Sequence, residues 1–181
     1  MKKIFTMIAC ALLVCAFNLQ AQKPTGDYVA TVWGAKSDGV TDNTASLQRA
    51  IDKIAENGGG MLEIYVGRYL TGALELKEGV KIYLGEGAVL VGTTNIYNYG
   101  GAPALIWAAE GTKGVGIEGK GVVEGRIKAL EENIADQKAK GYLPADFKAP
   151  SLTAFDSCPD ASVGADIKLV KDSAAKPYNR Q

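Results

Sequence analysis

The sequence predicts an all-β protein of the parallel β-helix, or solenoid, class. Short runs rich in Val, Ile, Leu and Tyr follow one another between residues 60 and 125, separated by glycines. Apolar and polar residues alternate in several runs, as in Val80–Leu84, which is the period of a half-buried strand. Strong apolar clusters at Leu62–Ile64, Ile82–Leu84 and Leu105–Trp107 recur roughly every 20 to 24 residues, a spacing that suits one solenoid coil.

Other β architectures fit these runs less well. No helical pattern separates the runs, so the sequence excludes βαβ crossovers. No Asn-Gly or Asp-Gly hairpin joins them either, which disfavours an antiparallel sandwich or barrel. Their links are single glycines or the tripeptide Gly85-Glu86-Gly87, and such links suit bends between strands that stack coil upon coil.

Composition limits the chemistry that the chain can perform. Apolar residues make up 47% and charged residues 22% of 181 residues, a balance typical of a folded domain. Lys plus Arg equals Asp plus Glu, at 20 each, so no overall field attracts nucleic acid. The chain contains no histidine, which excludes Ser-His and Cys-His nucleophile pairs and removes the commonest metal ligand. We therefore expect no metal, no cofactor and no nucleic-acid partner.

Residues 1–21 have the pattern of a secretory signal peptide. Lys2 and Lys3 precede the apolar run Ile4–Phe17, which is shorter than the roughly 20 residues needed to span a bilayer. Leu19-Gln20-Ala21 offers a cleavage site. These features predict a secreted or periplasmic protein without a membrane span, in which residues 22–181 form one partial β-helix domain.

The three cysteines predict no disulfide. Cys10 and Cys15 would leave with the signal, and neither suits lipid attachment. Cys10 precedes most of the apolar run, and Cys15 follows the bulky Val14. Cys158 would remain alone, with the expected role of a small apolar side chain in the core.

The first elements should close the end of the solenoid. We expect a short strand at Tyr28–Trp33, a turn at Gly34–Gly39, and then a helix that begins near Asp42 or Asn43, either of which can cap it. Asn57-Gly58 supplies its C-terminal cap. Its apolar face would cover the exposed first coil, and the residues of that face are Leu47, Ala50, Ile51, Ile54 and Ala55.

Strands and one helical excursion follow. The runs expected to form strands are Met61–Val66, Ala73–Leu76, Val80–Leu84, Ala88–Val91, Ala104–Ala108, Val115–Glu118 and Val122–Glu124. A helix over about residues 126–140 places Ile127, Leu130 and Ile134 on one face, which we expect to pack on the solenoid. Strand patterns return at Leu152–Phe155 and within 163–170, in the last coils, 150–173. The polar tail 174–181 should fray.

An ordered series of motifs resembles one family. The series resembles the start of pectin-active β-helices, namely polygalacturonases of glycoside hydrolase family 28 and related members of the pectate-lyase superfamily. The motifs are Trp33–Thr44, Leu47–Ile51, Gly58–Gly60, Gly67–Gly72, Val80–Leu84, Gly87–Leu90, Ala104–Trp107 and Ile117–Gly125. Coverage extends from about residue 28 to residue 125 and is weak after residue 150. The family often has a proline before the glycine at Gly67, where this chain has Val66.

The resemblance implies a right-handed β-helix that hydrolyses O-glycosyl bonds of pectin or polygalacturonate with inversion. Such enzymes carry Asn-x-Asp, Asp-Asp, Gly-His-Gly and Arg-Ile-Lys motifs on their middle coils. The first three are missing here, and Arg126-Ile127-Lys128 stands too early, at the start of a helix, so we interpret it as a coincidence. Glu118 and Glu124 are expected to be outward-facing carboxylates rather than a catalytic pair. We therefore assign no catalytic residue and leave the substrate-binding residues open.

Two further residue pairs have alternative interpretations. Asp38 and Asp42 could suggest calcium, but the roles of turn and helix-cap residues are favoured because no EF-hand spacing surrounds them. Tyr97 and Tyr99 could stack on sugar rings, although packing within a loop is favoured. The predicted partner is a pectic polysaccharide or oligosaccharide, and a truncated, inactive β-helix would also need a missing C-terminal half or a partner chain. The alternative is a non-catalytic module that binds acidic polysaccharide or acts as an adhesin.

Overall fold

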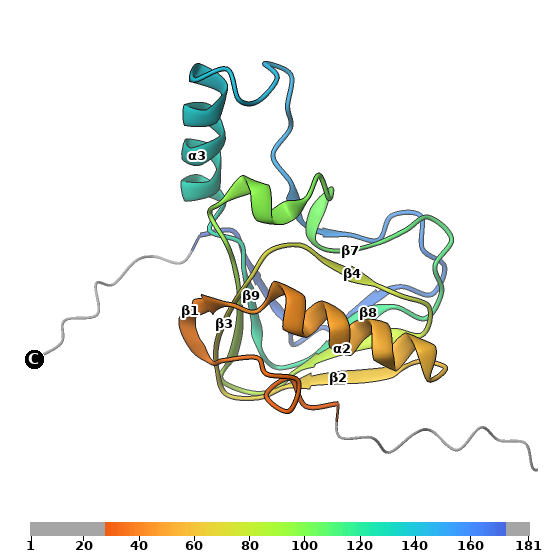
Figure 1. Cartoon of the computed structure of the whole chain (residues 1–181). Coiled ribbons are helices and arrows are strands. Elements are labelled where there is room, and N and C mark those ends of the chain that lie inside the picture. The colour runs from red at the N-terminus through yellow and green to blue at the C-terminus, as the bar shows by residue number, and fades with distance from the viewer. Residues whose placement is uncertain (1–27, 173–181) are drawn as a thin grey trace, which may run out of the picture.

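The computed structural model describes residues 28–172. The signal-peptide prediction for residues 1–21 and the prediction for the tail 174–181 lie outside these described residues. The described residues form a right-handed parallel β-helix of three sheets, as the sequence predicts (Figure 1). Sheet A contains β2 (Gly60–Ile64), β5 (Val80–Leu84), β8 (Gly116–Gly119) and β11 (Ser162–Val163). Sheet B contains β1 (Asp38–Asp42), β3 (Gly67–Thr71), β6 (Ala88–Gly92), β9 (Val122–Glu124) and β12 (Lys168–Val170). Sheet C contains β4 (Leu74–Leu76), β7 (Ala104–Ala108) and β10 (Ser151–Ala154).

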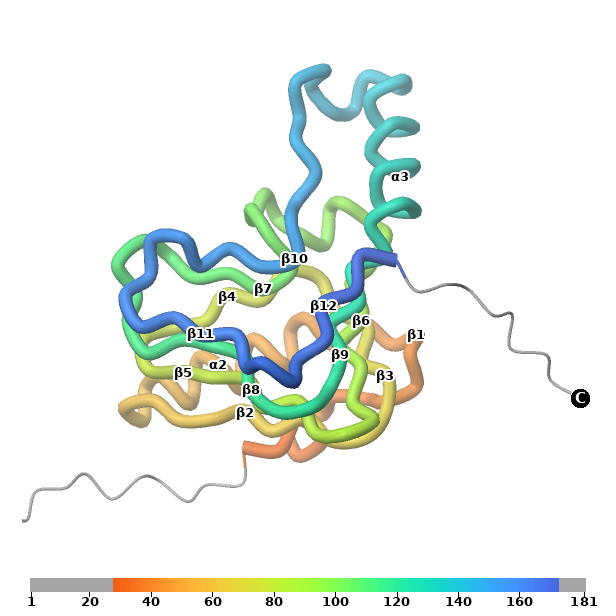
Figure 2. The backbone as a smooth tube through the Cα atoms, turned by 180° about the vertical axis from the view of Figure 1, so that it is seen from behind, coloured from red at the N-terminus to blue at the C-terminus, as the bar shows by residue number. Residues whose placement is uncertain are grey.

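Each coil visits sheet A, sheet B and sheet C in turn, and each strand pairs in parallel with the strand one coil earlier. Leu62 pairs with Ile82 and Ile82 with Ile117, and all three side chains are fully buried. The alternation read from the sequence therefore places one face of every strand in a common core. Figure 2 shows successive coils stacked upon one another from the reverse side.

One part of the predicted repeat is wrong. The cluster Leu105–Trp107 lies in β7 of sheet C and pairs with β4, so it does not stack on Ile82–Leu84. The second coil is lengthened by a loop that contains the short 3₁₀ helix η2 (Ile96–Tyr99), which the sequence patterns did not reveal. The segment Gly67–Thr71, which matches a family motif but was not predicted to be a strand, forms β3.

The amphipathic helix α2 (Thr44–Glu56) closes the N-terminal end, as predicted. Leu47, Ala50, Ile51 and Ile54 are buried, and the helix packs mainly on β2 and β4. Gly58 adopts a left-handed φ of 89° just past the helix, where an L side chain would be strained. The first coil is therefore covered by an apolar helix face rather than left open to water.

The strand expected at Tyr28–Trp33 is not formed. Only Val29 makes an isolated bridge, to Glu63, and the chain turns from Ala30 onward. Val32 is 69% exposed, so its apolar character does not reflect burial in a sheet. Pairing with sheet B begins instead at β1, where Asp38 is in register with Arg68.

The helix α3 (Ile127–Ala139) forms the predicted excursion and ends before Gly141, which has a left-handed φ of 75°. It stands away from the coils (Figures 1 and 2) and packs on η2. The Asn133 side-chain oxygen accepts a hydrogen bond from the Ile96 amide at 3.3 Å. Leu130 and Ile134 are buried on its inner face. The apolar face therefore packs on a second excursion, and its buried side chains belong to the same hydrophobic cluster as the core of the coils, as expected.

Cys158 is a free cysteine that packs against the core, in line with its expected role as a small apolar side chain. It is half-buried, and its Sγ lies 3.4 Å from the carbonyl oxygen of Ala109. None of the helices within residues 28–172 has the length and apolar character required to cross a membrane.

Candidate functional site

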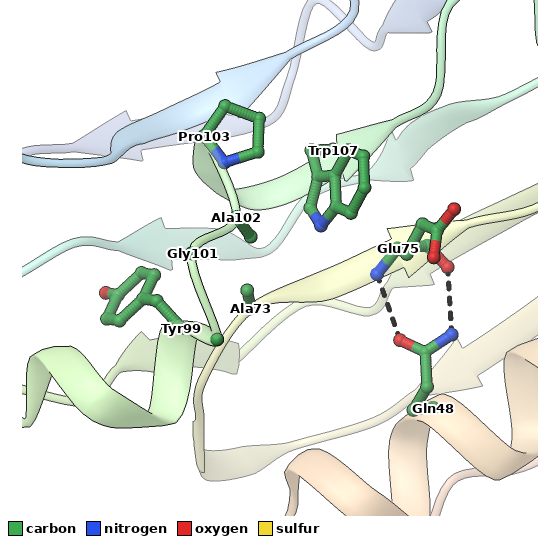
Figure 3. A pocket seen from close by; sticks show the side chains of 9 residues that line it. Gln48, Ala73, Glu75, Tyr99, Gly101, Ala102, Pro103 and Trp107 are labelled. Atoms are coloured by element: carbon green, nitrogen blue, oxygen red, sulfur yellow. Dashed lines mark hydrogen bonds between the residues drawn. The ribbon is translucent and has the colours of Figure 1, made fainter.

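The excursions that carry η2 and α3 leave the β-helix at the same corner, between sheet B and sheet C. A cleft of about 340 Å³ lies beside them on the outer face of sheet C (Figure 3). Helix α2, strands β4 and β7 and the loop after η2 enclose it. The residues that line it are Gln48, Ala73, Glu75, Tyr99, Gly100, Gly101, Ala102, Pro103 and Trp107.

Trp107 and Glu75 form the floor of this cleft. They are register partners on β7 and β4, and they lie side by side in Figure 3. Their neighbours Leu76 and Ile106 are fully buried, so the alternation of the strands turns Trp107 and Glu75 outward. Ala154 of β10 continues the row beyond Trp107. Ala154 therefore places only a small side chain next to Trp107 on the side of the third coil.

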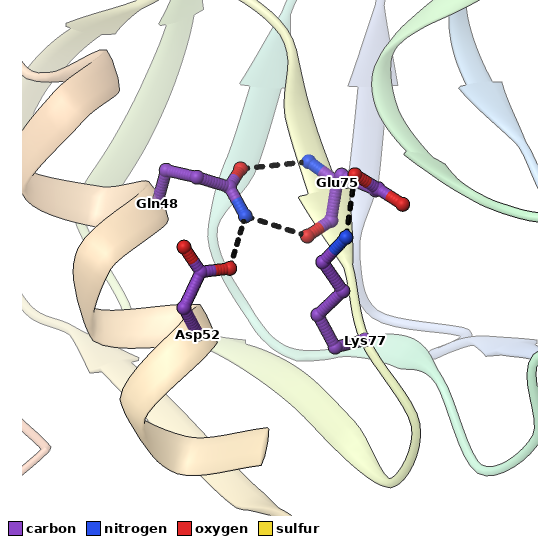
Figure 4. A network of polar contacts seen from close by, with 4 residues as sticks. All are labelled: Gln48, Asp52, Glu75 and Lys77. Carbon is purple, nitrogen blue, oxygen red and sulfur yellow. Dashed lines mark hydrogen bonds and ion pairs between the residues drawn. The ribbon is translucent and has the colours of Figure 1, made fainter. Parts of the chain in front are cut away.

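Gln48 of α2 fixes the position of β4. Its side-chain oxygen accepts a hydrogen bond from the Glu75 amide at 2.9 Å, and its Nε2 donates to the Glu75 carbonyl oxygen at 3.0 Å (Figure 4). Asp52, one helical turn later, accepts a second hydrogen bond from Nε2 at 2.9 Å. β4 is the edge strand of sheet C, so the Gln48 amide takes the place of a neighbouring strand.

The Glu75 carboxylate forms an ion pair with Lys77, with an N–O distance of 2.6 Å. Both side chains are partly exposed, at 29% for Glu75 and 39% for Lys77. Among residues 28–172, Glu75 is the single carboxylate that lines the cleft. A carboxylate in this position can accept hydrogen bonds from hydroxyl groups of a ligand.

The loop after η2 gives the cleft a rim without bulky side chains. Gly100 and Gly101 have left-handed φ values of 57° and 82°, and a Cβ atom added at either would meet nothing within 4 Å. Tyr99 is buried beneath them and donates a hydrogen bond to the Thr93 carbonyl oxygen at 3.3 Å. Burial raises the pKa of Tyr99 to about 12, against an opposing effect of Arg126. The ring points away from Trp107 (Figure 3), so Tyr99 supports the rim rather than offering a stacking surface.

The structure separates Glu118 from Glu124. Glu118 faces outward on sheet A and pairs with Lys81 at 2.6 Å, as expected for a solvated face. Glu124 lies in sheet B beside the core residue Val123 and is only 5% exposed, which corrects the prediction that its carboxylate lies on a solvated face. It is an ion-pair partner of Arg68, which lies two coils earlier, at 2.8 Å. The strand pattern around Glu124 could not reveal this partner, because Arg68 lies 56 residues earlier in the chain.

Asp38 and Asp42 have the predicted roles of turn and cap residues. Asp38 accepts hydrogen bonds from the Val40 and Thr41 amides at 3.0 and 2.8 Å. Asp42 accepts one from the Thr44 amide at 2.9 Å at the start of α2. Asn43 turns inward instead, is 1% exposed, and binds the backbone of residue 36 in both directions.

The remaining sequence candidates lie away from the floor of the cleft. Tyr97 is 57% exposed, and its hydroxyl is 3.1 Å from the Gln137 side-chain oxygen on α3. Arg126-Ile127-Lys128 begins α3, with Arg126 at a left-handed φ of 52°, so the tripeptide lies at a helix start as the sequence indicated. Among residues 28–172, no three or more Asp, Glu or Cys side chains are grouped so that they could hold a metal ion.

Sequence reasoning did not single out Gln48 or Trp107. The alternation Leu74-Glu75-Leu76 already indicated that Glu75 points away from the core. Trp107 follows the buried Ile106 in the same way. The missing information was that β4 and β7 are adjacent, which depends on the length of the loop between β6 and β7.

Comparisons with known proteins agree with this geometry. No protein-family model matches the chain. An exo-poly-α-D-galacturonosidase from Dickeya chrysanthemi is 35% identical over 114 residues, which cover 52% of this chain and 19% of that protein. A candidate glycosyl hydrolase of known structure from Parabacteroides merdae is 43% identical with a TM-score of 0.73, and the match covers 78% of this chain and 63% of that one.

A third similar protein shows the same fold. The family 28 exopolygalacturonase of Yersinia enterocolitica has a TM-score of 0.66 at 22% identity, over 78% of this chain and 34% of that one. The chain therefore spans less than two thirds of the length of each of these relatives.

Proposed function

We propose that this chain, which resembles part of the family 28 polygalacturonases, belongs to an exported glycosidase that hydrolyses O-glycosyl bonds of pectin or polygalacturonate with inversion. In this proposal residues 1–21 direct export to the periplasm or the medium, and residues 22–181 provide one end of a β-helix. The cleft over sheet C carries the proposal, because it combines an aromatic surface with a carboxylate that can bind hydroxyl groups. The similarity to the Dickeya and Parabacteroides proteins supports it.

The lining of the cleft suits sugar binding. Trp107 offers an apolar ring face against which a pyranose ring can stack, and the Glu75 carboxylate can accept hydrogen bonds from sugar hydroxyls. The bare rim at Gly100 and Gly101 allows a chain of sugar units to pass along the groove. These groups would bind and orient a glycan.

The same lining does not provide the chemistry of hydrolysis. Inverting glycosidases use one carboxylic acid to protonate the leaving oxygen and a second carboxylate, about 6.5–9.5 Å away, to activate water. The described residues place one carboxylate in the cleft, that of Glu75, and Lys77 pairs with it. We therefore propose that the catalytic pair is contributed by further coils, either of a longer chain or of a partner chain, and that this polypeptide alone binds pectic glycans without cleaving them.

Two assays on the purified chain test this proposal. Reducing-sugar release from polygalacturonate should not exceed that of a heat-killed sample, and release above that control would contradict the absence of hydrolysis. A partly methyl-esterified pectic oligosaccharide should bind in calorimetry, and Trp107→Ala should weaken binding by about tenfold or more, as for other aromatic anchors. The matched control is Tyr142→Ala, which removes an aromatic ring that is 69% exposed and does not line the cleft. No binding at millimolar ligand would overturn the proposal.

The second candidate is a non-catalytic module that binds acidic polysaccharide or acts as an adhesin. The single carboxylate in the cleft favours it, because a binding module needs no acid and base pair. The nucleotide sequence after the codon for residue 181 separates the two candidates. A continuation, in frame or frameshifted, that encodes Asn-x-Asp and Asp-Asp motifs supports the glycosidase, whereas its absence supports the module.

A further inference from the structure

We infer that the cleft over sheet C selects an uncharged sugar unit, such as a neutral hexopyranose or a methyl-esterified uronate, over a free uronate. This inference rests on the proposed function and specifies the unit of the glycan that occupies this part of the groove. Pectic polysaccharides contain both charged and uncharged units, so the preference determines where along a chain the cleft can bind.

The charge around the cleft floor is the first reason. In the described part of the chain, Glu75 is the only cleft-lining residue with an ionised carboxylate, and no Lys or Arg lines the cleft. Lys77 approaches the Glu75 carboxylate at 2.6 Å, and Asp52 joins the same network through Gln48. The two carboxylates of Glu75 and Asp52 therefore outnumber the single ammonium group of Lys77 in this network. A ligand carboxylate beside Glu75 would be repelled, whereas a ligand hydroxyl would donate a hydrogen bond to it.

The apolar part of the lining is the second reason. Besides the ring of Trp107 on the floor, the apolar side chains of Ala73, Ala102 and Pro103 line the cleft (Figure 3). A carboxylate placed against such groups loses water without gaining a basic partner, which is unfavourable. A hydroxymethyl group or a methyl ester loses far less hydration in the same place. The open rim at Gly100 and Gly101 leaves room for either substituent, so charge and hydration rather than size set the preference.

The test compares ligands that differ only at the C6 group. Galactose oligosaccharides, galacturonate oligosaccharides of the same linkage, and the methyl esters of the latter are titrated into the purified chain. Both uncharged ligands should bind about three- to tenfold more tightly than the free uronate, and raising the salt from about 0.01 M to about 1 M should reduce the difference by screening.

Three variants assign the preference to the cleft. Glu75→Gln keeps the shape but removes the charge, so it should raise affinity for the uronate and reduce or reverse the preference. Lys77→Met should increase the preference, because the carboxylate loses its cationic partner. Glu131→Gln is the matched control, since it makes the same charge change on the exposed side of α3. It should leave the ratio of the affinities for the uncharged ligands and the free uronate unchanged.

The outcomes separate this inference from the proposal on which it rests. Equal or tighter binding of the free uronate by the unaltered chain would overturn the selection of uncharged units while supporting a pectic ligand. The selection of uncharged units would also be overturned if Glu75→Gln left the ratio of these two affinities unchanged. Failure of all three ligands and of the partly esterified oligosaccharide to bind would overturn the proposed function, and this inference with it.

Discussion

The carboxylate of Asp38 organises the turn into the first strand of sheet B. One of its oxygens accepts hydrogen bonds from the Val40 and Thr41 amides, and the other accepts one from the Thr41 hydroxyl at 2.6 Å. These hydrogen bonds, led by that of the Thr41 hydroxyl and helped by nearby Lys36, lower the pKa of Asp38 from 3.8 to about 2. The charged carboxylate therefore stabilises the folded turn.

Replacing Asp38 with asparagine should destabilise the protein in a pH-dependent way. The variant keeps an acceptor oxygen but loses the charge. Because the pKa is lower in the folded state, the contribution of Asp38 is complete above pH 3.8 and is lost as the pH falls through about 2. The free energies of unfolding of the wild type and Asp38→Asn should therefore differ at pH 7 and converge near pH 2.

Urea unfolding at several pH values, together with an NMR titration of the Asp38 carboxyl carbon, measures this effect. Asp146→Asn is the control, since Asp146 is an exposed aspartate in the loop after α3. An equal pH dependence for the two variants would show that the hydrogen bonds of the turn do not stabilise the charged form.

At the scale of elements, α2 does more than cover the core with its apolar face. Through Gln48 it pairs with the backbone of β4, an edge strand of sheet C, and so sets the position of Glu75 at the cleft. Asp52 fixes the orientation of the Gln48 amide, because its carboxylate accepts a hydrogen bond from Nε2. A capping helix and a binding surface are thereby coupled by one side chain.

Gln48→Ala should lower the free energy of unfolding by about 1–3 kcal/mol, since it removes both partners of the β4 backbone groups. Gln48→Glu should be at least as harmful at neutral pH, because a carboxylate then faces Asp52 and the Glu75 carbonyl oxygen. Its stability relative to the wild type should improve in mild acid, where protonation restores a donor.

Urea unfolding at pH 7 and in mild acid tests both variants. The control is Arg49→Ala on the exposed side of the same helix, which should change stability by no more than about 0.5 kcal/mol. If Gln48→Ala lowered the free energy of unfolding by no more than Arg49→Ala does, the Gln48 amide would not stabilise the edge of sheet C.

At the scale of the whole molecule, the two ends of the described β-helix differ. Helix α2 covers the N-terminal end, whereas β10, β11 and β12 are the last strands of their sheets among residues 28–172. Val163 and Leu169 occupy core positions, in register with the fully buried Ile117 and Val123, yet they are 39% and 42% exposed. This end presents both apolar side chains and strand edges to its surroundings.

We expect the isolated chain to self-associate through this end in a concentration-dependent manner. Val163→Thr combined with Leu169→Thr should reduce the association with little effect on the melting temperature, because both side chains are already partly exposed. Sedimentation at several concentrations measures it. Val66→Thr is the matched control, since Val66 is 72% exposed at a corner of the coils. If the unaltered chain, the double variant and Val66→Thr associated equally, the contact between copies would not involve Val163 and Leu169.

The sequence by itself determined which face of each element is apolar. The spacing of Leu47 and Ile54 predicted the buried face of α2, the alternation in Val80–Leu84 predicted β5, and glycines marked the corners between strands. The turn role of Asp38 was equally readable. All of these features depend on residues a few positions apart, where the backbone geometry alone relates one side chain to the next.

Only the tertiary structure decided which coil lies on which. Loops of unequal length between sheets B and C change the number of residues in each coil, and so Leu105–Trp107 pairs with β4 while β8 stacks on β5. Glu124 is buried and pairs with Arg68 from two coils earlier, and the run at Tyr28–Trp33 is no strand because only Val29 forms a β-bridge. The cleft formed by Glu75 and Trp107 arises in the same way. Its two residues belong to successive coils, and their contact depends on how the intervening chain folds back rather than on any local spacing.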